Sequence, residues 1–128
     1  MQKENQNSFT SEKKLSQSYI IKQFDESVKL YSHSFDWPFR KELELPSVEA
    51  IIGNMQELRI LDYGCSTGNY CRWFQSKKAK YVVGYDICES VLNYAKKLEL
   101  HAPKNITYIS ELNEVYTGIF DVVTMIYV

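Results

Sequence analysis

The chain lacks a long hydrophobic run. None of its 128 residues belongs to a segment that approaches the roughly 20 apolar residues needed to span a membrane as a helix. Residues 1–18 also lack the apolar centre of a secretory signal peptide. These absences argue against a membrane partner, and we expect a cytoplasmic protein.

An excess of charge of either sign is also missing. The chain has 15 basic and 16 acidic side chains, and its formal net charge at pH 7 is −1. Domains that bind nucleic acid usually carry a basic surplus or a basic stripe, and the sequence contains neither. The charge balance therefore argues against a nucleic-acid partner and favours small-molecule chemistry.

Cysteine and histidine are scarce. The three cysteines (Cys65, Cys71 and Cys88) form no Cys-x-x-Cys pair, and an odd number cannot be fully paired within one chain. A zinc site would need more ligands at regular spacing, whereas His33 and His101 stand alone. We expect reduced cysteines and no metal site.

The residues that are present divide the chain into three parts. Residues 1–18 are polar and are expected to form a mobile tail, because they offer little apolar surface to bury. Residues 19–54 carry apolar side chains at helical spacing, which predicts an N-terminal helical cap with a turn at 32–38. Pro46 is expected to break or restart the second helix of this cap, and Gly53-Asn54 to end it.

Residues 55–128 alternate between strand-like and helical patterns. The strand-like runs are 58–63, 80–85, 105–109 and 120–128, and the helical runs are 70–76 and 89–100. Apolar strands separated by helices predict an α/β fold, a Rossmann-like doubly wound parallel sheet covered on both faces. The length allows one domain.

The last strand-like run raises a separate question, because the sequence stops on it. An apolar strand at an open sheet edge invites pairing with another chain. Either the sheet is truncated after its fourth strand, as in a fragment of a longer protein, or an oligomer or another partner covers the edge. We favour the fragment.

Acids and small residues gather where the first two strands end. Asp62 ends the first strand, and Gly64 and Gly68 enclose Ser66 in a tight turn before a helix; Asp86 ends the second strand. Carboxylates and bare backbone N–H groups would therefore meet at one edge, as in sites for nucleotide-like ligands. The alternatives are a helix cap for Asp86, a turn-stabilising role for Asp62, and an ordinary strand-to-helix turn.

Two other site types share part of this pattern. Gly64-x-Ser66-x-Gly68 is also the skeleton of the hydrolase nucleophile elbow. That enzyme class needs a later Asp and then a His, and His101 is the sole histidine after Ser66. The dinucleotide fingerprint would need glycine where Ser66 and Asn69 stand. A hydrolase site and a dinucleotide-binding site are therefore both disfavoured.

Three segments together resemble a known family. Ile60–Gly68, with the sequence Ile-Leu-Asp-Tyr-Gly-Cys-Ser-Thr-Gly, is similar to the cofactor motif of class I S-adenosylmethionine-dependent methyltransferases. Val82–Leu92 resembles the second strand and following helix of that family, and Phe120–Val123 the start of its fourth strand. Phe39–Ser47 and Asn69–Arg72 look like the small-molecule enzymes of the toxoflavin-synthase type.

The resemblance implies a Rossmann-like enzyme that moves a methyl group from S-adenosylmethionine to a small-molecule acceptor. The alternative is a catalytically inactive module that binds the cofactor or a partner. The turn residues Gly64, Cys65, Ser66 and Gly68 would approach the methionine part of the cofactor, and Asp62 would orient its amino group. Ser66 replaces the usual middle glycine and would crowd the site if that position requires a positive φ.

The resemblance also assigns the remaining cofactor contacts. Asp86 would bind the ribose hydroxyls, with Ile87 against the adenine. Glu111 or Leu112, after the third strand, would contact the adenine as well. The set is completed by Tyr127 at the end of the fourth strand and by Tyr31 and Arg40, which would close over the cofactor. No residue is required as a general base, so the catalytic residues stay unassigned.

Overall fold

The computed structural model describes residues 19, 22–23 and 25–128, which divide into two compact units between Ser34 and Phe35. In the first unit residues 25–33 are helical, so the turn predicted for 32–38 begins too early. A short 3-10 helix, η1 (Ser34–Asp36), follows. The predicted mobile tail, 1–18, and three apolar members of the predicted first helix (Ile20, Ile21 and Phe24) lie outside the described residues.

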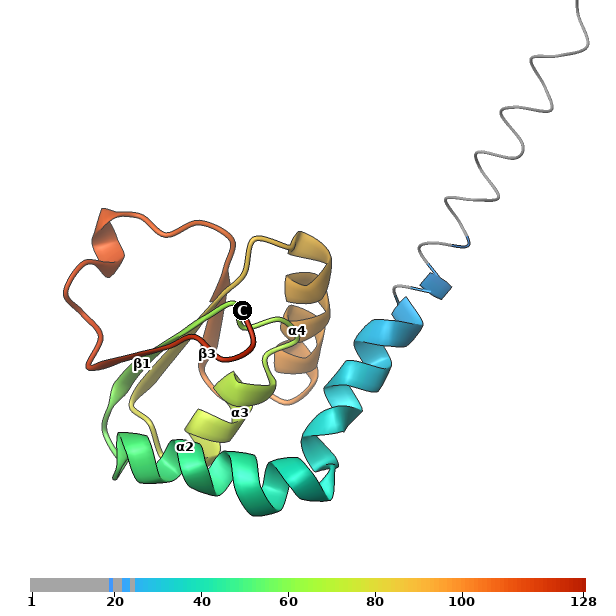
Figure 1. Cartoon of the computed structure of the whole chain (residues 1–128). Coiled ribbons are helices and arrows are strands. Elements are labelled where there is room, and N and C mark those ends of the chain that lie inside the picture. The colour runs from blue at the N-terminus through green and yellow to red at the C-terminus, as the bar shows by residue number, and fades with distance from the viewer. Residues whose placement is uncertain (1–18, 20–21, 24) are drawn as a thin grey trace, which may run out of the picture. The chain divides into compact units, whose positions relative to one another are not determined.

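The second unit is built on a four-stranded parallel sheet (Figure 1). Its strands are β1 (Arg59–Tyr63), β2 (Tyr81–Tyr85), β3 (Ile106–Ile109) and β4 (Val122–Thr124), in the order β3-β2-β1-β4. The first three begin one residue later than predicted and end where predicted. The fourth is much shorter than predicted, because the chain leaves the sheet after Thr124.

Two helices connect the first three strands and share one core. They are α3 (Asn69–Ser76) and α4 (Glu89–His101). Phe74 of α3 and Leu92 of α4 are at most 1% exposed, and both pack in one cluster with strand residues such as Val82. α3 and α4 therefore lie on the same face of the sheet (Figure 1). A short helix, η3 (Glu114–Tyr116), lies between β3 and β4.

Pro46 changes the helix type ahead of β1. The segment η2 (Arg40–Glu44) is π-helical and runs into α2 (Leu45–Ile52). The Leu45 N–H donates to the carbonyl of Arg40, five residues back. Proline has no N–H and its ring clashes with the carbonyl four residues before it, so a wider turn accommodates it. The predicted stop is confirmed, since Gly53 caps α2 with a φ of 82°.

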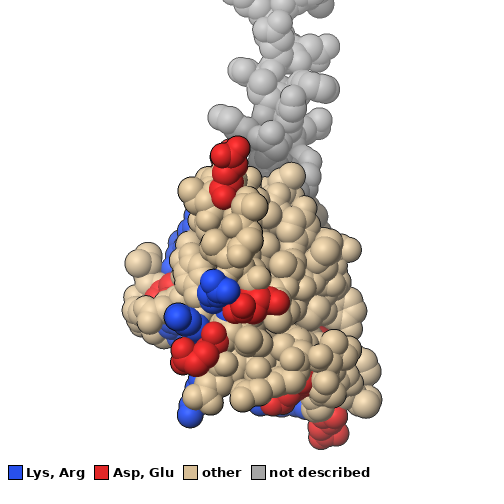
Figure 2. All heavy atoms as spheres, turned by 90° about the vertical axis from the view of Figure 1, so that its left-hand side faces the viewer, with Lys and Arg blue, Asp and Glu red and all other residues tan. Residues whose placement is uncertain are grey.

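The surface carries no dominant charge of one sign in the view of Figure 2. Basic and acidic side chains intermingle there, and uncharged residues separate them. Surface ion pairs include that of Arg59 with Asp121, at 2.9 Å. Among the helices of the described residues, none has the length and apolar character that a membrane span requires.

Candidate cofactor site

β1 passes into α3 through a tight turn at residues 64–68. Gly64 and Gly68 have φ angles of 77° and 81°, in the left-handed region that favours glycine. The N–H groups of Gly64 and Cys65 both donate to the carbonyl of Tyr85, at 2.7 and 2.8 Å. The turn is therefore fixed to the end of β2, and the predicted strand–turn–helix arrangement is confirmed.

Ser66 adopts the conformation for which a glycine would be better suited. Its φ is 50°, and its N–H donates to Asp86 Oδ2 at 2.9 Å. A non-glycine residue in this region is disfavoured by about 1–2 kcal/mol. The hydrogen bond to Asp86 helps to hold Ser66 in this strained geometry.

Replacing Ser66 with glycine should stabilise the fold. We expect Ser66→Gly to raise the free energy of unfolding by about 0.5–1 kcal/mol, because relief of strain outweighs the added flexibility of the unfolded chain. Urea denaturation measures the change. Ser47→Gly in α2 is the control and should lower stability by about 0.5 kcal/mol, since Ser47 has ordinary helical angles. Equal losses in both variants would contradict strain at Ser66.

Asp62 is buried where β1 meets β4. It is 3% exposed; Thr124 Oγ1 donates to its Oδ1 at 2.8 Å, and the Cys71 thiol faces its Oδ2 at 3.7 Å. Burial raises the pKa of Asp62 to about 6, while the two hydrogen bonds oppose the shift. The carboxylate therefore bridges β1, β4 and α3 in a dry environment. Its assigned contact with a cofactor amino group stays a prediction.

Asp86 follows β2 and joins the glycine turn to the start of α4. Its Oδ2 accepts the Ser66 N–H, and its Oδ1 accepts the Cys88 N–H at 2.8 Å. The N-cap residue of α4 is Cys88, so the helix-cap alternative for Asp86 is wrong; Asp86 forms a two-residue side-chain turn instead. Asp86 is half-buried, and a carboxylate has about four acceptor positions, so capacity for a ligand remains.

The apolar and acidic residues predicted to face an adenine lie at the same edge. Ile87, next to Asp86, is 83% exposed. The Asp86 N–H donates to the carbonyl of Ile109 at 3.2 Å, which places the end of β3 beside Asp86. Glu111 and Leu112 follow β3 and are both exposed. The structure thus brings the ends of β2 and β3 together, while the roles of these residues stay predictions.

Three residues (Arg40, Tyr127 and Tyr31) were predicted to complete the cofactor site, and the structure brings two of them together. Arg40 and Tyr127 come together: the Arg40 guanidinium lies over the Tyr127 ring, 5.2 Å from its centroid. Both contact Glu44, which accepts from Arg40 Nη1 at 3.2 Å and from Tyr127 Oη at 2.9 Å. Tyr31 belongs to the first unit, so no position relative to the turn is assigned to it.

Sequence reasoning missed Glu44 and Tyr70. Tyr70, in the first turn of α3, donates its hydroxyl to Glu44 Oε1 at 2.5 Å. The Glu44 carboxylate and desolvation both raise the pKa of Tyr70 strongly, desolvation being the larger cause. The spacing of Arg40 and Glu44, four apart in a helical pattern, was the available signal for their ion pair. Tyr70 lies in the segment Asn69–Arg72 named above, but no local pattern predicted its contact with Glu44.

Two buried hydroxyls near the turn have no hydrogen-bond partner among the described residues. They belong to Thr67, inside the turn, and to Tyr108 of β3. The Tyr108 ring packs under the turn, against Gly68 and Gly84. Desolvation raises the pKa of Tyr108 strongly. The side chains of Thr67 and Tyr108 are therefore part of the buried packing around the glycine turn.

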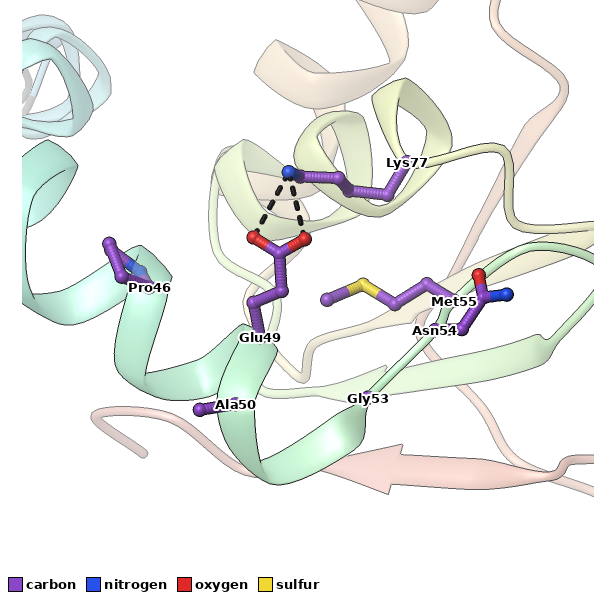
Figure 3. Close-up of a pocket in the computed structure, with 7 residues that line it drawn as sticks. All are labelled: Pro46, Glu49, Ala50, Gly53, Asn54, Met55 and Lys77. Carbon is purple, nitrogen blue, oxygen red and sulfur yellow. Dashed lines mark hydrogen bonds and ion pairs between the residues drawn. The ribbon is translucent and has the colours of Figure 1, made fainter.

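An open hollow of about 610 Å³ lies elsewhere, between α2 and α3 (Figure 3). The side chains of Glu49 and Lys77 face each other there in an ion pair of 3.1 Å. Met55 precedes β1 and Lys77 precedes β2, so the hollow lies at the amino end of these strands. Ligands of open α/β sheets bind at the carboxyl ends, and this hollow is therefore separate from the candidate site.

The fold and the site together define the class. A parallel sheet presents a glycine turn and a half-buried acid at the carboxyl edge of two neighbouring strands, which is the arrangement of a Rossmann-like nucleoside-binding domain. The chain belongs to the methyltransferase domain family, which residues 29–128 match. The resemblance of the motifs to class I methyltransferases is confirmed at this level, whereas the toxoflavin-synthase branch is not.

Known proteins support the same assignment. An S-adenosylmethionine-dependent methyltransferase from Mesorhizobium loti is 32% identical, with a TM-score of 0.54 over 64% of this chain and 38% of that one. One from Aquifex aeolicus is 25% identical, with a TM-score of 0.56 over 74% of this chain and 54% of that one. An uncharacterized protein of Haemophilus influenzae is 31% identical over 55 residues, 43% of this chain and 22% of its own. The chain thus covers about half of the length of the Aquifex aeolicus protein and less than half of the other two.

Proposed function

We propose that this domain binds S-adenosylmethionine and serves methyl transfer to a small-molecule acceptor. The observation that carries the proposal is the position of Asp86. Its carboxylate is tied to the glycine turn through Ser66 and stands beside the exposed Ile87. A nucleoside needs both features, an acceptor for ribose hydroxyls and an apolar surface for the base. Family membership and the two solved methyltransferases support the donor.

The proposed contacts follow the carboxyl edge of the sheet. Asp86 would accept hydrogen bonds from the ribose hydroxyls, and Ile87 with Leu112 would contact the adenine. The methionine part would approach the bare backbone at Gly64, where the absence of a side chain permits close contact. The carboxylate, the exposed apolar surface and the bare backbone suit the three chemical parts of the cofactor.

The protein's contribution to methyl transfer would be positioning. The sulfonium of the donor supplies an already activated methyl group. The residues of the site would hold the donor so that an acceptor approaches in line, which is the effect of proximity and orientation on rate. Glu44 is held by Arg40 and two tyrosine hydroxyls, so it is a poor candidate for a base.

Replacing Asp86 tests the cofactor assignment. We expect Asp86→Ala to weaken binding of S-adenosylhomocysteine at least tenfold, about 1.5 kcal/mol, because a charged hydrogen-bond acceptor is lost. Isothermal titration calorimetry measures the affinity. Asp36→Ala is the control, since Asp36 is highly exposed and pairs on the surface with Lys41. Absence of binding by the unmodified protein would refute the cofactor, and equal affinity in both variants would refute the role of Asp86.

A second candidate function is a catalytically inactive module that binds the cofactor or a partner. It is favoured by β4, which lies at an edge of the described sheet: Val123 in β4 is 57% exposed, and Met125, just after it, is 64% exposed. An apolar strand edge is a surface for pairing with another chain. Cofactor binding without transfer of a labelled methyl group to any small-molecule pool would favour the module, and transfer would favour the enzyme.

A further inference from the structure

The glycine turn has an unfavourable backbone conformation that neighbouring elements must hold. The φ of 50° at Ser66 is disfavoured for a residue with a side chain. Where the chain enters the turn, the N–H groups of Gly64 and Cys65 donate to the carbonyl of Tyr85 and tie it to β2. Where the chain leaves the turn, α3 begins, and a side chain of α3 that reaches another element fixes this exit.

That side chain belongs to Tyr70, the second residue of α3. Tyr70 is 6% exposed, and its ring meets the Phe35 ring edge-on, with 5.0 Å between the centroids. Its hydroxyl donates to Glu44 Oε1 at 2.5 Å. A hydrogen bond to a charged carboxylate is stronger than one between neutral groups. Because Tyr70 follows Gly68 by two residues, this bond restrains the exit of the turn as well as the helix.

The π-helical segment η2 places Glu44 for this contact. Glu44 is the last residue of η2, and Pro46 follows two residues later in α2. Its side chain is 8% exposed, and Arg40 donates to the same carboxylate oxygen at 3.2 Å. A buried carboxylate is tolerated only where donors satisfy it, so Glu44 is confined to this position. π-Helical turns inside helices are frequent at functional sites.

A second contact joins the same helices at the other end of α3, and it is weaker. Glu49 of α2 pairs there with Lys77 at 3.1 Å (Figure 3), with side chains 48% and 36% exposed. Ion pairs this exposed contribute little, because solvent screens them. The buried contact between Glu44 and Tyr70 is therefore the stronger of the two, and it lies at the glycine turn.

We propose that Glu44 is a positioning residue for the cofactor site: through Tyr70 it holds the glycine turn in the strained geometry that receives the methionine part of S-adenosylmethionine. The inference rests on the proposed function, which supplies the ligand. A site held in its binding geometry loses less free energy to ordering when the ligand binds. Loss of the contact should therefore weaken recognition of the amino-acid part, while Asp86 and Ile87 still serve the nucleoside.

Two ligands separate these parts of the site. Tyr70→Phe keeps the buried ring, removes its hydrogen bond to Glu44 and leaves the bond from Tyr127 to Glu44 in place. We expect it to weaken S-adenosylhomocysteine binding about three- to tenfold, because a hydrogen bond to a charged group is lost. Binding of 5′-methylthioadenosine, which has the nucleoside without the amino-acid part, should stay the same. Isothermal titration calorimetry with each ligand measures both affinities.

A graded series tests Glu44 itself. Glu44→Gln keeps an oxygen for the Tyr70 hydroxyl and loses the charge, so it should retain more of the affinity for S-adenosylhomocysteine than Glu44→Ala does. The matched controls are Glu49→Gln, at the far end of α3, and Tyr116→Phe, whose ring stacks on Phe120 between β3 and β4. Both controls should leave the affinity for either ligand unchanged.

The outcomes distinguish positioning from a structural role and from failure of the proposed function. Equal weakening of both ligands by Tyr70→Phe would mean that the contact supports the domain in general and would overturn the positioning of the turn. Unchanged affinity for S-adenosylhomocysteine in Tyr70→Phe and Glu44→Gln would also overturn it, with the cofactor site intact. If the unmodified protein does not bind S-adenosylhomocysteine, the proposed function fails, and the role of Glu44 fails with it.

Discussion

Gly68→Ala is expected to destabilise the domain by roughly 2–5 kcal/mol. Gly68 has a φ of 81°, a conformation that an alanine adopts at a cost of about 1–2 kcal/mol. The added Cβ would lie 2.2 Å from Tyr108 Oη and 2.8 Å from two ring carbons. Tyr108 is buried in the core cluster, so overpacking there should add about 1–3 kcal/mol. Urea denaturation followed by circular dichroism measures the loss.

Two further variants separate strain from collision. Gly118→Ala is the control for strain alone, because Gly118 has a φ of 70° with no atom within 4 Å of the added Cβ. It should cost about 1–2 kcal/mol. Tyr108→Phe removes the unpartnered hydroxyl and should restore part of the stability of Gly68→Ala, since the two changes share one contact. A Gly68→Ala variant no less stable than Gly118→Ala would contradict the close packing of the turn on β3.

The second large effect concerns pH. The folded-state pKa of Asp62 is about 6, above its value of about 3.9 in an unfolded chain. The folded protein therefore keeps this proton in a range where the unfolded chain has lost it, so stability falls as the pH rises from about 4 to 6. The shift of about two units corresponds to a loss of stability of about 3 kcal/mol, which is absent below pH 4 and complete above pH 6.

Asp62→Asn should flatten this dependence. The amide is neutral at every pH and keeps an oxygen for the Thr124 hydroxyl, so the variant should be more stable than the unmodified protein at pH 7 and similar at pH 4. Urea denaturation at pH 4, 5, 6 and 7 gives the comparison. Asp121→Asn is the control: Arg59 lowers the pKa of Asp121 to about 2, so the stability linked to Asp121 is lost only below about pH 4. The same slope in Asp62→Asn as in the unmodified protein would contradict the burial of a charged Asp62.

Much of the core fold was predictable because interior parallel strands bury both faces. Val82 and Val83 are consecutive and both fully buried, and such continuous apolar runs located β1 and β2. The same criterion failed at 125–128. Apolar composition does not tell whether a chain stays in a sheet or crosses its edge, and Met125 to Val128 look like strand while they leave it.

The site was predictable where it depends on local sequence. The positions of the glycine turn and of Asp86 at the strand ends were predicted correctly. Ser66 was expected to crowd the site if its φ were positive, and its φ is 50°. The contact of Glu44 with Tyr127 joins residues 83 apart, so no local pattern contained it. The π-helical segment was likewise missed, because Pro46 signals a disruption without specifying how the backbone absorbs it.

The order of the strands has a consequence for how the domain forms. β1 pairs with β2 across a short stretch of chain, but Asp62 and Thr124, which join β1 to β4, are 62 residues apart. Closing the longer loop carries an additional entropy cost of roughly 1 kcal/mol, so β4 should dock last. During folding the glycine turn would then form before β4 docks and before the Val128 side chain packs against Gly64.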